Sequence, residues 1–289
     1  MKKIIERLLI FIIGVPAIFA IVMFLPFRHN LIMNLVVVFF SGVGALEFSS
    51  MLEKKNIKIP KAESFILGAI GPLALTLHIS FDLPVFYLIA ASVALAMWAL
   101  VSRVFSKACE IENITNKVVG CFSLILYPGF FMSWLVLMSI WERPAIILLF
   151  LFITFGNDSF AWLFGTLFGA KNRGIIAVSP NKSIAGYIGG LLGSVIVAAI
   201  AMQFLSFIFH KQILIDVPFS IIETKIIILG LCTGIAASLG DLAESAIKRS
   251  CDFVDSGNFI LGRGGVLDSI DSIAFAAPVF FLLFFKFFQ

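Results

Sequence analysis

The feature that most constrains this chain is the length of its apolar runs, which only short polar segments interrupt. Hydrophobic residues make up 61% of its 289 residues and charged residues only 13%, a balance outside that of soluble globular domains. A helix crosses a bilayer core of roughly 30 Å with about 20 apolar residues, so the chain has room for about nine spans. We therefore expect an all-α polytopic integral membrane protein. The expected spans are 7–27, 31–52, 64–80, 84–103, 118–141, 144–169, 184–209, 220–240 and 266–288.

The positions of the basic residues predict how the chain lies in the membrane. If the N-terminus faces the cytoplasm, all but five of the 21 lysine and arginine residues fall on the cytoplasmic side, in agreement with the positive-inside rule. The exceptions are Arg28, Arg143, Lys211, Lys225 and Lys286. We therefore expect a multi-pass protein of the cell (inner) membrane whose polar motifs face the cytoplasm. Because this asymmetry accounts for the net charge of +4, no nucleic-acid partner is expected.

One long polar passage, residues 240–272, interrupts the apolar pattern near the C-terminus. Asp241, Glu244, Ser245 and Lys248 follow the spacing i, i+3, i+4, i+7. If this part of the passage is helical, these side chains share one face, which carries acidic and basic groups together. We interpret this face as part of the active site.

A glycine-rich link and a second acidic group follow in the same passage. Asp268, Asp271 and Ser272 stand at i, i+3 and i+4 where the last apolar helix should begin. Carboxylates that converge from two helix ends can bind a hard divalent cation through oxygen and leave room for phosphate. The passage therefore predicts a metal site that works on phosphate groups.

The same passage resembles a known family. Residues 245–249, 254–255 and 264–271 are similar, in the same register, to the C-terminal motif of the phosphatidate cytidylyltransferases (CDP-diacylglycerol synthases). That motif has S-x-x-K-R, four residues, K-D, and after a fixed gap P-G-H-G-G-x-x-D-R-x-D. Residues 240–245 also match the G-D-L-x-E-S that precedes it.

Two further segments resemble this family. Residues 158–169 are similar to its D-[ST]-x-A-[YW]-x-x-G-x-x-F-G, and residues 179–190 to its S-P-K-K-T-W-E-G-x-x-G-G. Independently of the family, Asp158 lies in the middle of an apolar span and must face a protein interior or a wet cavity, either as a functional group or as a paired structural one. Ser179 and Lys182, at a helix start, suit phosphate binding or a simple capping turn.

The chain departs from the family pattern at several positions. The departures are Val254 for Lys, Leu261 for Pro, Arg263 for His, Ser269 for Arg, and Ala185 for Glu. Within the C-terminal motif two cationic side chains are lost and one is gained. These changes bear on how phosphate charge is neutralised and less on how a metal is held.

The resemblance implies an enzyme that transfers CMP from CTP to phosphatidic acid, with CDP-diacylglycerol and pyrophosphate as products. It also implies dependence on Mg²⁺, with room for a second cation, and a homodimer. The expected metal ligands are Asp241, Asp268, Glu244 and Asp255. The expected catalytic residues are Asp241, Asp268, Lys248 and Asp271. The expected substrate-binding residues are Arg249, Arg263, Ser179, Lys182, Asp158 and Ser245. Residues 1–143 would form N-terminal transmembrane helices and residues 144–289 the C-terminal catalytic transmembrane region.

The sequence leaves alternatives open. The changes at Val254, Ala185 and Ser269 permit a CTP-dependent enzyme on another lipid, such as a prenol kinase or an isoprenoid lipid cytidylyltransferase, or a degenerate relative without activity. A secondary transporter could use Asp158 and Glu47 as coupling carboxylates, but no internal repeat is visible. Glu47 is the one charged residue of the second expected span, and it either lines the polar cavity or packs near the interface.

Overall fold

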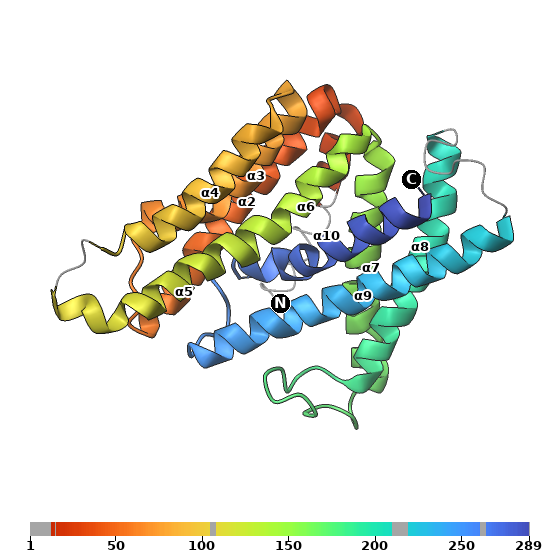
Figure 1. Cartoon of the computed structure of the whole chain (residues 1–289). Helices are drawn as coiled ribbons and strands as arrows, with labels where there is room; N and C mark the ends of the chain where they lie inside the picture. The colour runs from red at the N-terminus through yellow and green to blue at the C-terminus, as the bar shows by residue number, and fades with distance from the viewer. Residues whose placement is uncertain (1–12, 15, 105–107, 210–218, 261–263, 289) are drawn as a thin grey trace. The chain divides into compact units, whose positions relative to one another are not determined.

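The computed structural model describes residues 13, 14, 16–104, 108–209, 219–260 and 264–288, and their regular structure is helical (Figure 1). The α-helices are α2 (Phe27–Lys54), α3 (Lys61–Phe81), α4 (Val85–Val101), α5 (Ile114–Leu124), α6 (Phe131–Leu137), α7 (Pro144–Phe168), α8 (Ile184–Ile208), α9 (Phe219–Ser250) and α10 (Leu267–Phe288). Shorter 3₁₀ or π-helical segments are η1 (Ala108–Asn113), η2 (Ile125–Phe130) and η3 (Met138–Trp141). Within the described residues, β structure is limited to two isolated bridges. The all-α fold is confirmed.

Seven helical stretches of the described residues are long and apolar enough to cross a membrane. They are Phe27–Lys54, Lys61–Phe81, Ile111–Trp141, Pro144–Phe168, Ile184–Ile208, Thr224–Ser250 and Leu267–Phe288. The apolar helix α4 has 17 residues and is shorter than these. The protein is thus a polytopic membrane protein, while the count of nine spans stays a prediction. Of the first expected span, 7–27, residues 7–12 and 15 lie outside the described residues.

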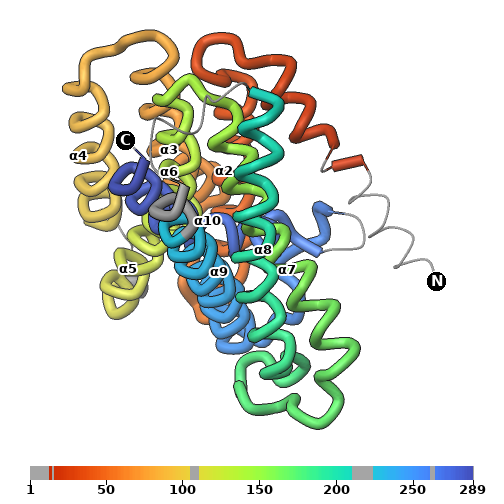
Figure 2. The backbone as a smooth tube through the Cα atoms, turned by 90° about the vertical axis from the view of Figure 1, so that its right-hand side faces the viewer, coloured from red at the N-terminus to blue at the C-terminus, as the bar shows by residue number. Residues whose placement is uncertain are grey.

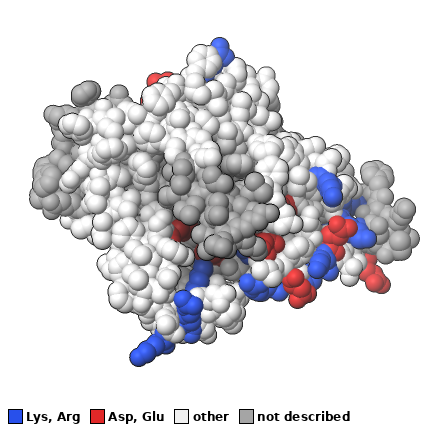
Figure 3. Space-filling model, turned by 180° about the vertical axis from the view of Figure 1, so that it is seen from behind, with Lys and Arg blue, Asp and Glu red and all other residues white. Residues whose placement is uncertain are grey.

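The exposed surface supports a lipid environment. On α4, large apolar side chains are more than half exposed, among them Phe86 (68%), Met97 (58%) and Trp98 (56%). Most of the surface seen in Figure 3 carries no charged side chain. Water would disfavour so much exposed apolar area, whereas hydrocarbon tails accept it.

The chain divides into two compact units. Unit 1 comprises residues 1–142 and 250–270, and unit 2 comprises residues 143–249 and 271–289. Unit 1 therefore contains α2 to α6 together with the polar link before α10, and unit 2 contains α7 to α9 and most of α10. The assignment of catalysis to 144–289 and of a separate helical region to 1–143 stays a prediction.

Close helix contacts through small residues build unit 1. A side chain at Gly68 of α3 would collide with Ala45 of α2, so the two helices approach closely at this point. The Ser41 hydroxyl lies within hydrogen-bond distance of two carbonyl oxygens, those of Gly68 (2.8 Å) and of Pro128, and donates to one of them at a time. Pro128 lies in the π-helical segment η2. Proline has no backbone N–H, and the wider π-helical turn accommodates the missing hydrogen bond.

Unit 2 is built on α7 and α8, which lie side by side (Figure 2). A side chain at Gly193 of α8 would overlap Phe160 of α7, and one at Gly189 would overlap Phe164. The glycines thus form a groove for two aromatic rings, which is how helices pack where no hydrophobic effect drives them together. This packing holds the link between α7 and α8 in place at one end of the pair.

Candidate active site

Asp268 is held by the link that precedes its own helix. Its Oδ2 accepts hydrogen bonds from the backbone N–H of Ser256 (2.8 Å), the backbone N–H of Gly265 (2.7 Å) and the Ser256 hydroxyl (2.9 Å). The Ser256 oxygen accepts one in return from the backbone N–H of Asp268 (3.2 Å). This reciprocal pattern resembles a capping box and fixes the carboxylate at the start of α10, where the helix dipole favours negative charge.

Glu47 of α2 reaches the same helix start. Its Oε1 accepts a hydrogen bond from the backbone N–H of Val266 (3.0 Å), and its Oε2 accepts from the N–H of Leu267 (2.8 Å) and the Ser256 hydroxyl (3.0 Å). The N–H groups of a first helical turn have no partner inside the helix, so a buried carboxylate suits them. Only 9% of Glu47 is exposed. Its carboxylate therefore points at the link and the start of α10.

Glycines make this approach possible. A side chain at Gly257 would collide with Glu47, and one at Gly265 would collide with both Glu47 and Ser256. Gly264 has φ +103°, a left-handed conformation that other residues avoid. The described part of the glycine-rich link therefore wraps tightly around two carboxylates.

The second group of expected residues lies on α9 in unit 2. The helix continues to Ser250, so Asp241, Glu244, Ser245 and Lys248 do share one helical face. Lys248 Nζ and Glu244 Oε2 lie 2.5 Å apart, with the Glu244 side chain fully buried and that of Lys248 11% exposed. A buried ion pair of this kind holds the Lys248 side chain in a fixed place, because breaking it would leave a buried charge without its partner.

Lys182 joins this face from the link between α7 and α8. Its ammonium group forms an ion pair with the Asp241 carboxylate, and it also lies 5.8 Å from the ring centroid of Tyr187. Ser183 caps α8 by accepting a hydrogen bond from the N–H of Gly186 (3.1 Å). The structure therefore brings together Lys182 and Asp241, two residues that sequence reasoning had placed in one site although 59 positions separate them.

The other expected residues take different positions. Asp158 is half-buried in α7, where its Oδ1 accepts a long hydrogen bond from Asn157 (3.5 Å). Asn157 in turn donates to Ser238 of α9 (3.3 Å), which ties the two helices together. Ser179 closes the turn before α8, because its carbonyl accepts from the N–H of Lys182 (3.1 Å).

Three further residues complete the expected set within the described part of the chain. Asp271 is buried in the first turns of α10, and its Oδ1 accepts a hydrogen bond from the N–H of Ser272 (2.6 Å). Asp255 and Arg249 are exposed. Arg263 and the departure Leu261 lie outside the described residues.

The expected metal ligands divide between the two units. Asp241 and Glu244 belong to unit 2, whereas Asp255 and Asp268 belong to unit 1, so their convergence on one cation stays a prediction. Among the residues that the structure describes, no three His, Cys, Asp or Glu side chains are grouped closely enough to hold a metal ion. The donor chemistry fits Mg²⁺ all the same, because carboxylate oxygens are its preferred protein ligands.

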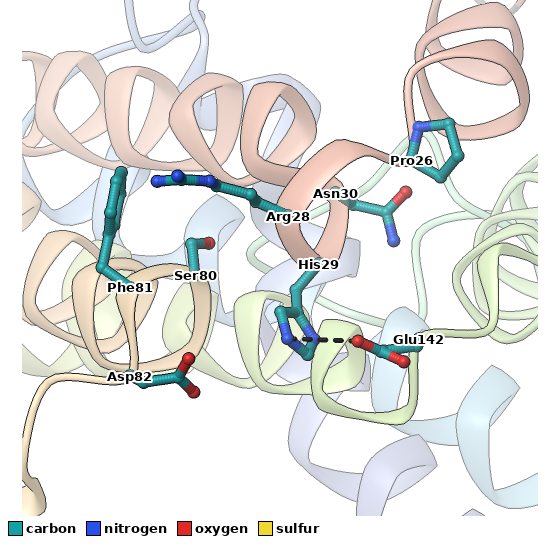
Figure 4. A pocket seen from close by; sticks show the side chains of 8 residues that line it. All are labelled: Pro26, Arg28, His29, Asn30, Ser80, Phe81, Asp82 and Glu142. Atoms are coloured by element: carbon teal, nitrogen blue, oxygen red, sulfur yellow. Dashed lines mark ion pairs between the residues drawn. The ribbon is translucent and has the colours of Figure 1, made fainter.

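A cavity of about 750 Å³ lies elsewhere in unit 1, at the ends of α2 and α3 (Figure 4). Its lining residues are Pro26, Arg28, His29, Asn30, Ser80, Phe81, Asp82 and Glu142. Inside it, His29 Nε2 and Glu142 Oε1 lie 3.2 Å apart. It contains none of the expected site residues, so its size is no argument for catalysis there.

Sequence reasoning missed Ser256 and left the role of Glu47 undecided. Ser256 falls in the gap of the family motif, and a serine in a polar loop carries no signal of its own. Glu47 did carry one, because a single carboxylate in an apolar span is costly unless something satisfies it. What satisfies it, the start of a helix more than 200 residues later, could not be read from the pattern.

The fold defines a polytopic membrane protein. Hydrogen-bonded carboxylates lie at the start of α10 in unit 1, and carboxylates paired with lysines lie on α9 in unit 2. A family model described as the cytidylyltransferase family matches residues 5–287. The chain belongs to this family.

Individual relatives agree with the family assignment. The chain is 30% identical over 277 residues to a protein of Staphylococcus saprophyticus subsp. saprophyticus named phosphatidate cytidylyltransferase, covering 92% of this chain and 96% of that one. Proteins of the same name from Staphylococcus aureus (strain COL) and Thermotoga maritima are 37% and 35% identical. These two matches cover 44% and 58% of this chain, and 44% and 60% of the relatives.

Proposed function

We propose that the protein transfers CMP from CTP to phosphatidic acid, forming CDP-diacylglycerol and pyrophosphate. The observation that carries this proposal is the similarity along nearly the whole chain to a relative that bears the name phosphatidate cytidylyltransferase. Both substrates are anions, so the lysines of α9 and of the link before α8 support the proposal. The carboxylates at the start of α10 and on α9 support it as ligands for the cation that such a reaction uses. The comparisons do not favour an enzyme acting on a prenol or an isoprenoid lipid.

The reaction joins two groups that repel each other. A phosphate oxygen of the lipid attacks the α-phosphorus of CTP in line, a new P–O bond forms, and the bond to the β-phosphate breaks to release pyrophosphate. The attacking oxygen has already lost its proton at neutral pH, so no general base is needed. Positioning and charge neutralisation then supply most of the rate enhancement.

In this proposal, Asp241 and Asp268 would be the main ligands of Mg²⁺, with Glu244, Asp255 and Asp271 as further carboxylates. Mg²⁺, alone or with a second cation, would supply positive charge that neutralises the phosphates. Lys248 and Lys182 would each move from a carboxylate partner to a phosphate oxygen. The other groups proposed to contact substrate are Arg249, Arg263, Ser179, Asp158 and Ser245.

The proposal extends to the setting of the enzyme. The distribution of lysine and arginine supports an active site on the cytoplasmic side of the cell (inner) membrane, where CTP is present. We also propose that it works as a homodimer without a nucleic-acid partner. The mass of the purified protein in detergent, corrected for bound detergent, tests the homodimer, and a monomer that is fully active would refute it.

A direct assay tests the reaction. The full chain, purified in detergent, is supplied with radiolabelled CTP, Mg²⁺ and either phosphatidic acid or a prenol, and lipid products are separated. We expect a CDP-lipid and an equal amount of pyrophosphate when phosphatidic acid is the acceptor, and no product when the prenol is. Transfer of phosphate to the prenol, or no product with phosphatidic acid, would contradict the proposal.

A further inference from the structure

Two carboxylates share a single hydroxyl group in unit 1. The Ser256 oxygen lies 3.0 Å from Glu47 Oε2 and 2.9 Å from Asp268 Oδ2, within hydrogen-bond distance of both. A serine hydroxyl has one hydrogen and donates to one acceptor at a time. Glu47 and Asp268 are therefore coupled, because whichever carboxylate takes this hydrogen bond withholds it from the other.

The shared hydroxyl and one of its two carboxylate partners are buried, and burying a charged carboxylate costs free energy. Ser256 is 3% exposed and Glu47 is 9% exposed. A carboxylate buried in a membrane span is expensive. The two backbone hydrogen bonds from the start of α10 and the shared Ser256 hydroxyl offset that cost only if the link stays folded around it. If position 47 were apolar, side chains of the link could accept the hydrogen bonds of the same helix end, and no charge would need to be buried.

We infer that Glu47 is a positioning residue for Asp268, acting through Ser256 and through the backbone of Val266 and Leu267. Glu47 holds the first turn of α10 in place, and Ser256 holds the Asp268 carboxylate in one orientation. This role rests on the proposed function for its meaning, since Asp268 is there a ligand of Mg²⁺. Nothing in the family motif of the polar passage points to either residue.

The arrangement also explains how a cation at Asp268 would be favoured. When a cation binds the Asp268 carboxylate, the cation compensates its negative charge. The Ser256 hydroxyl is then free to donate its one hydrogen to Glu47. A partner behind a metal ligand typically changes metal affinity or activity by about 10- to 100-fold when it is removed. We therefore expect Glu47 and Ser256 to tune cation affinity although neither touches the cation.

Two substitutions and one matched control test this inference in the full chain in detergent. The test variants are Glu47→Gln and Ser256→Ala. The control is Ser64→Ala, because Ser64 is also buried in unit 1 and its hydroxyl also bridges to another side chain, Ser49 (2.8 Å). Loss of one buried hydroxyl should therefore affect the stability of the two serine variants similarly.

The first readout is binding of Mn²⁺, used as a paramagnetic probe and followed by electron paramagnetic resonance without substrate. We expect the dissociation constant to rise about tenfold or more in both test variants and to stay unchanged in Ser64→Ala. The second readout is hydrogen exchange. The amides of residues 265–268 should exchange faster in the test variants, because their acceptors are lost or turned away.

The third readout is the Mg²⁺ dependence of CTP turnover. A positioning role predicts a higher Mg²⁺ requirement, partly restored at saturating Mg²⁺, whereas simple destabilisation lowers turnover at every concentration. Unchanged Mn²⁺ affinity and unchanged exchange in Ser256→Ala would overturn the inference. If the wild-type protein makes no CDP-lipid, the proposed function fails instead, and the Mn²⁺ and exchange measurements still decide the role of Glu47.

Discussion

At the scale of the residue, Asp268 combines two tasks in one carboxylate. It ties the preceding link to the start of its own helix through the hydrogen bonds from Ser256 and Gly265, and in the proposed reaction it binds Mg²⁺. The first task explains how the second can be performed with little loss of entropy, since the side chain is already fixed before any cation arrives.

Replacing Asp268 with asparagine keeps the shape of the side chain and removes its charge. We expect turnover to fall by about 100-fold or more, because a metal ligand should matter at least as much as its supporting partners. The loss of charged hydrogen bonds should cost about 1–3 kcal/mol of stability, so the protein remains folded. Turnover and thermal unfolding in detergent are the measurements.

The control for this variant is Asp252→Asn, an exposed aspartate of the same unit with φ +61°, a conformation that asparagine tolerates well. It should keep wild-type turnover. Wild-type turnover in Asp268→Asn itself would end the metal assignment.

Lys182 offers a second test at this scale. Lys182→Met removes the ammonium group that pairs with Asp241 and keeps most of the side-chain length. If Lys182 binds phosphate, kcat/KM for CTP should fall by about 10- to 100-fold, the usual value of a charge-assisted hydrogen bond. Lys171→Met, an exposed lysine of the same link, should leave kcat/KM unchanged. Equal losses of kcat/KM in the two variants would mean that only the total positive charge of the link matters, and would contradict a specific phosphate contact of Lys182.

At the scale of the element, the apolar pattern predicted the helices better than their ends. The range 144–169 corresponds closely to α7 and 184–209 to α8, because continuous apolar residues leave few other structures in a membrane. The range 220–240 was too short, since α9 continues to Ser250 through polar residues that hydropathy alone excludes. The spacing of Asp241 to Lys248 did indicate this extension.

The packing of α7 against α8 gives a prediction about stability. Gly193→Ala would place a methyl group against the ring of Phe160 and should destabilise the protein by about 1–3 kcal/mol. In Gly71→Ala of α3 the new atom would lie 3.4 Å from Ser133, an ordinary contact, so this control should be neutral or stabilising. Thermal unfolding in detergent compares the two, and equal unfolding temperatures would contradict the packing.

At the scale of the whole molecule, the sequence predicted the class and the family, and it could not predict the partner of Glu47. The motif segments around Asp158, Lys182 and Asp241 each have local spacing that can be recognised. The contact between α2 and the start of α10 has no such spacing, because it joins residues 219 and 220 positions apart. Long-range contacts of single side chains are invisible to periodicity.

The proposed orientation can be tested on the intact protein in cells. In a variant without its four native cysteines, Lys58→Cys lies in a segment proposed to face the cytoplasm and Phe81→Cys in one proposed to face outward; both positions are exposed. A membrane-impermeant thiol reagent should label Phe81→Cys in intact cells and Lys58→Cys only after permeabilisation. The reverse result would place the motifs on the wrong side for CTP.

The bond between Glu47 and the first turn of α10 also has a consequence for biogenesis. Because its partners lie 209 to 220 residues downstream, they are synthesised much later than α2. At roughly 5–20 residues per second, the ribosome needs about 10–40 s to reach them. During that interval a nascent carboxylate stays in or near the translocon without its final partners, so assembly of this helix cannot be completed until translation of the chain is almost finished.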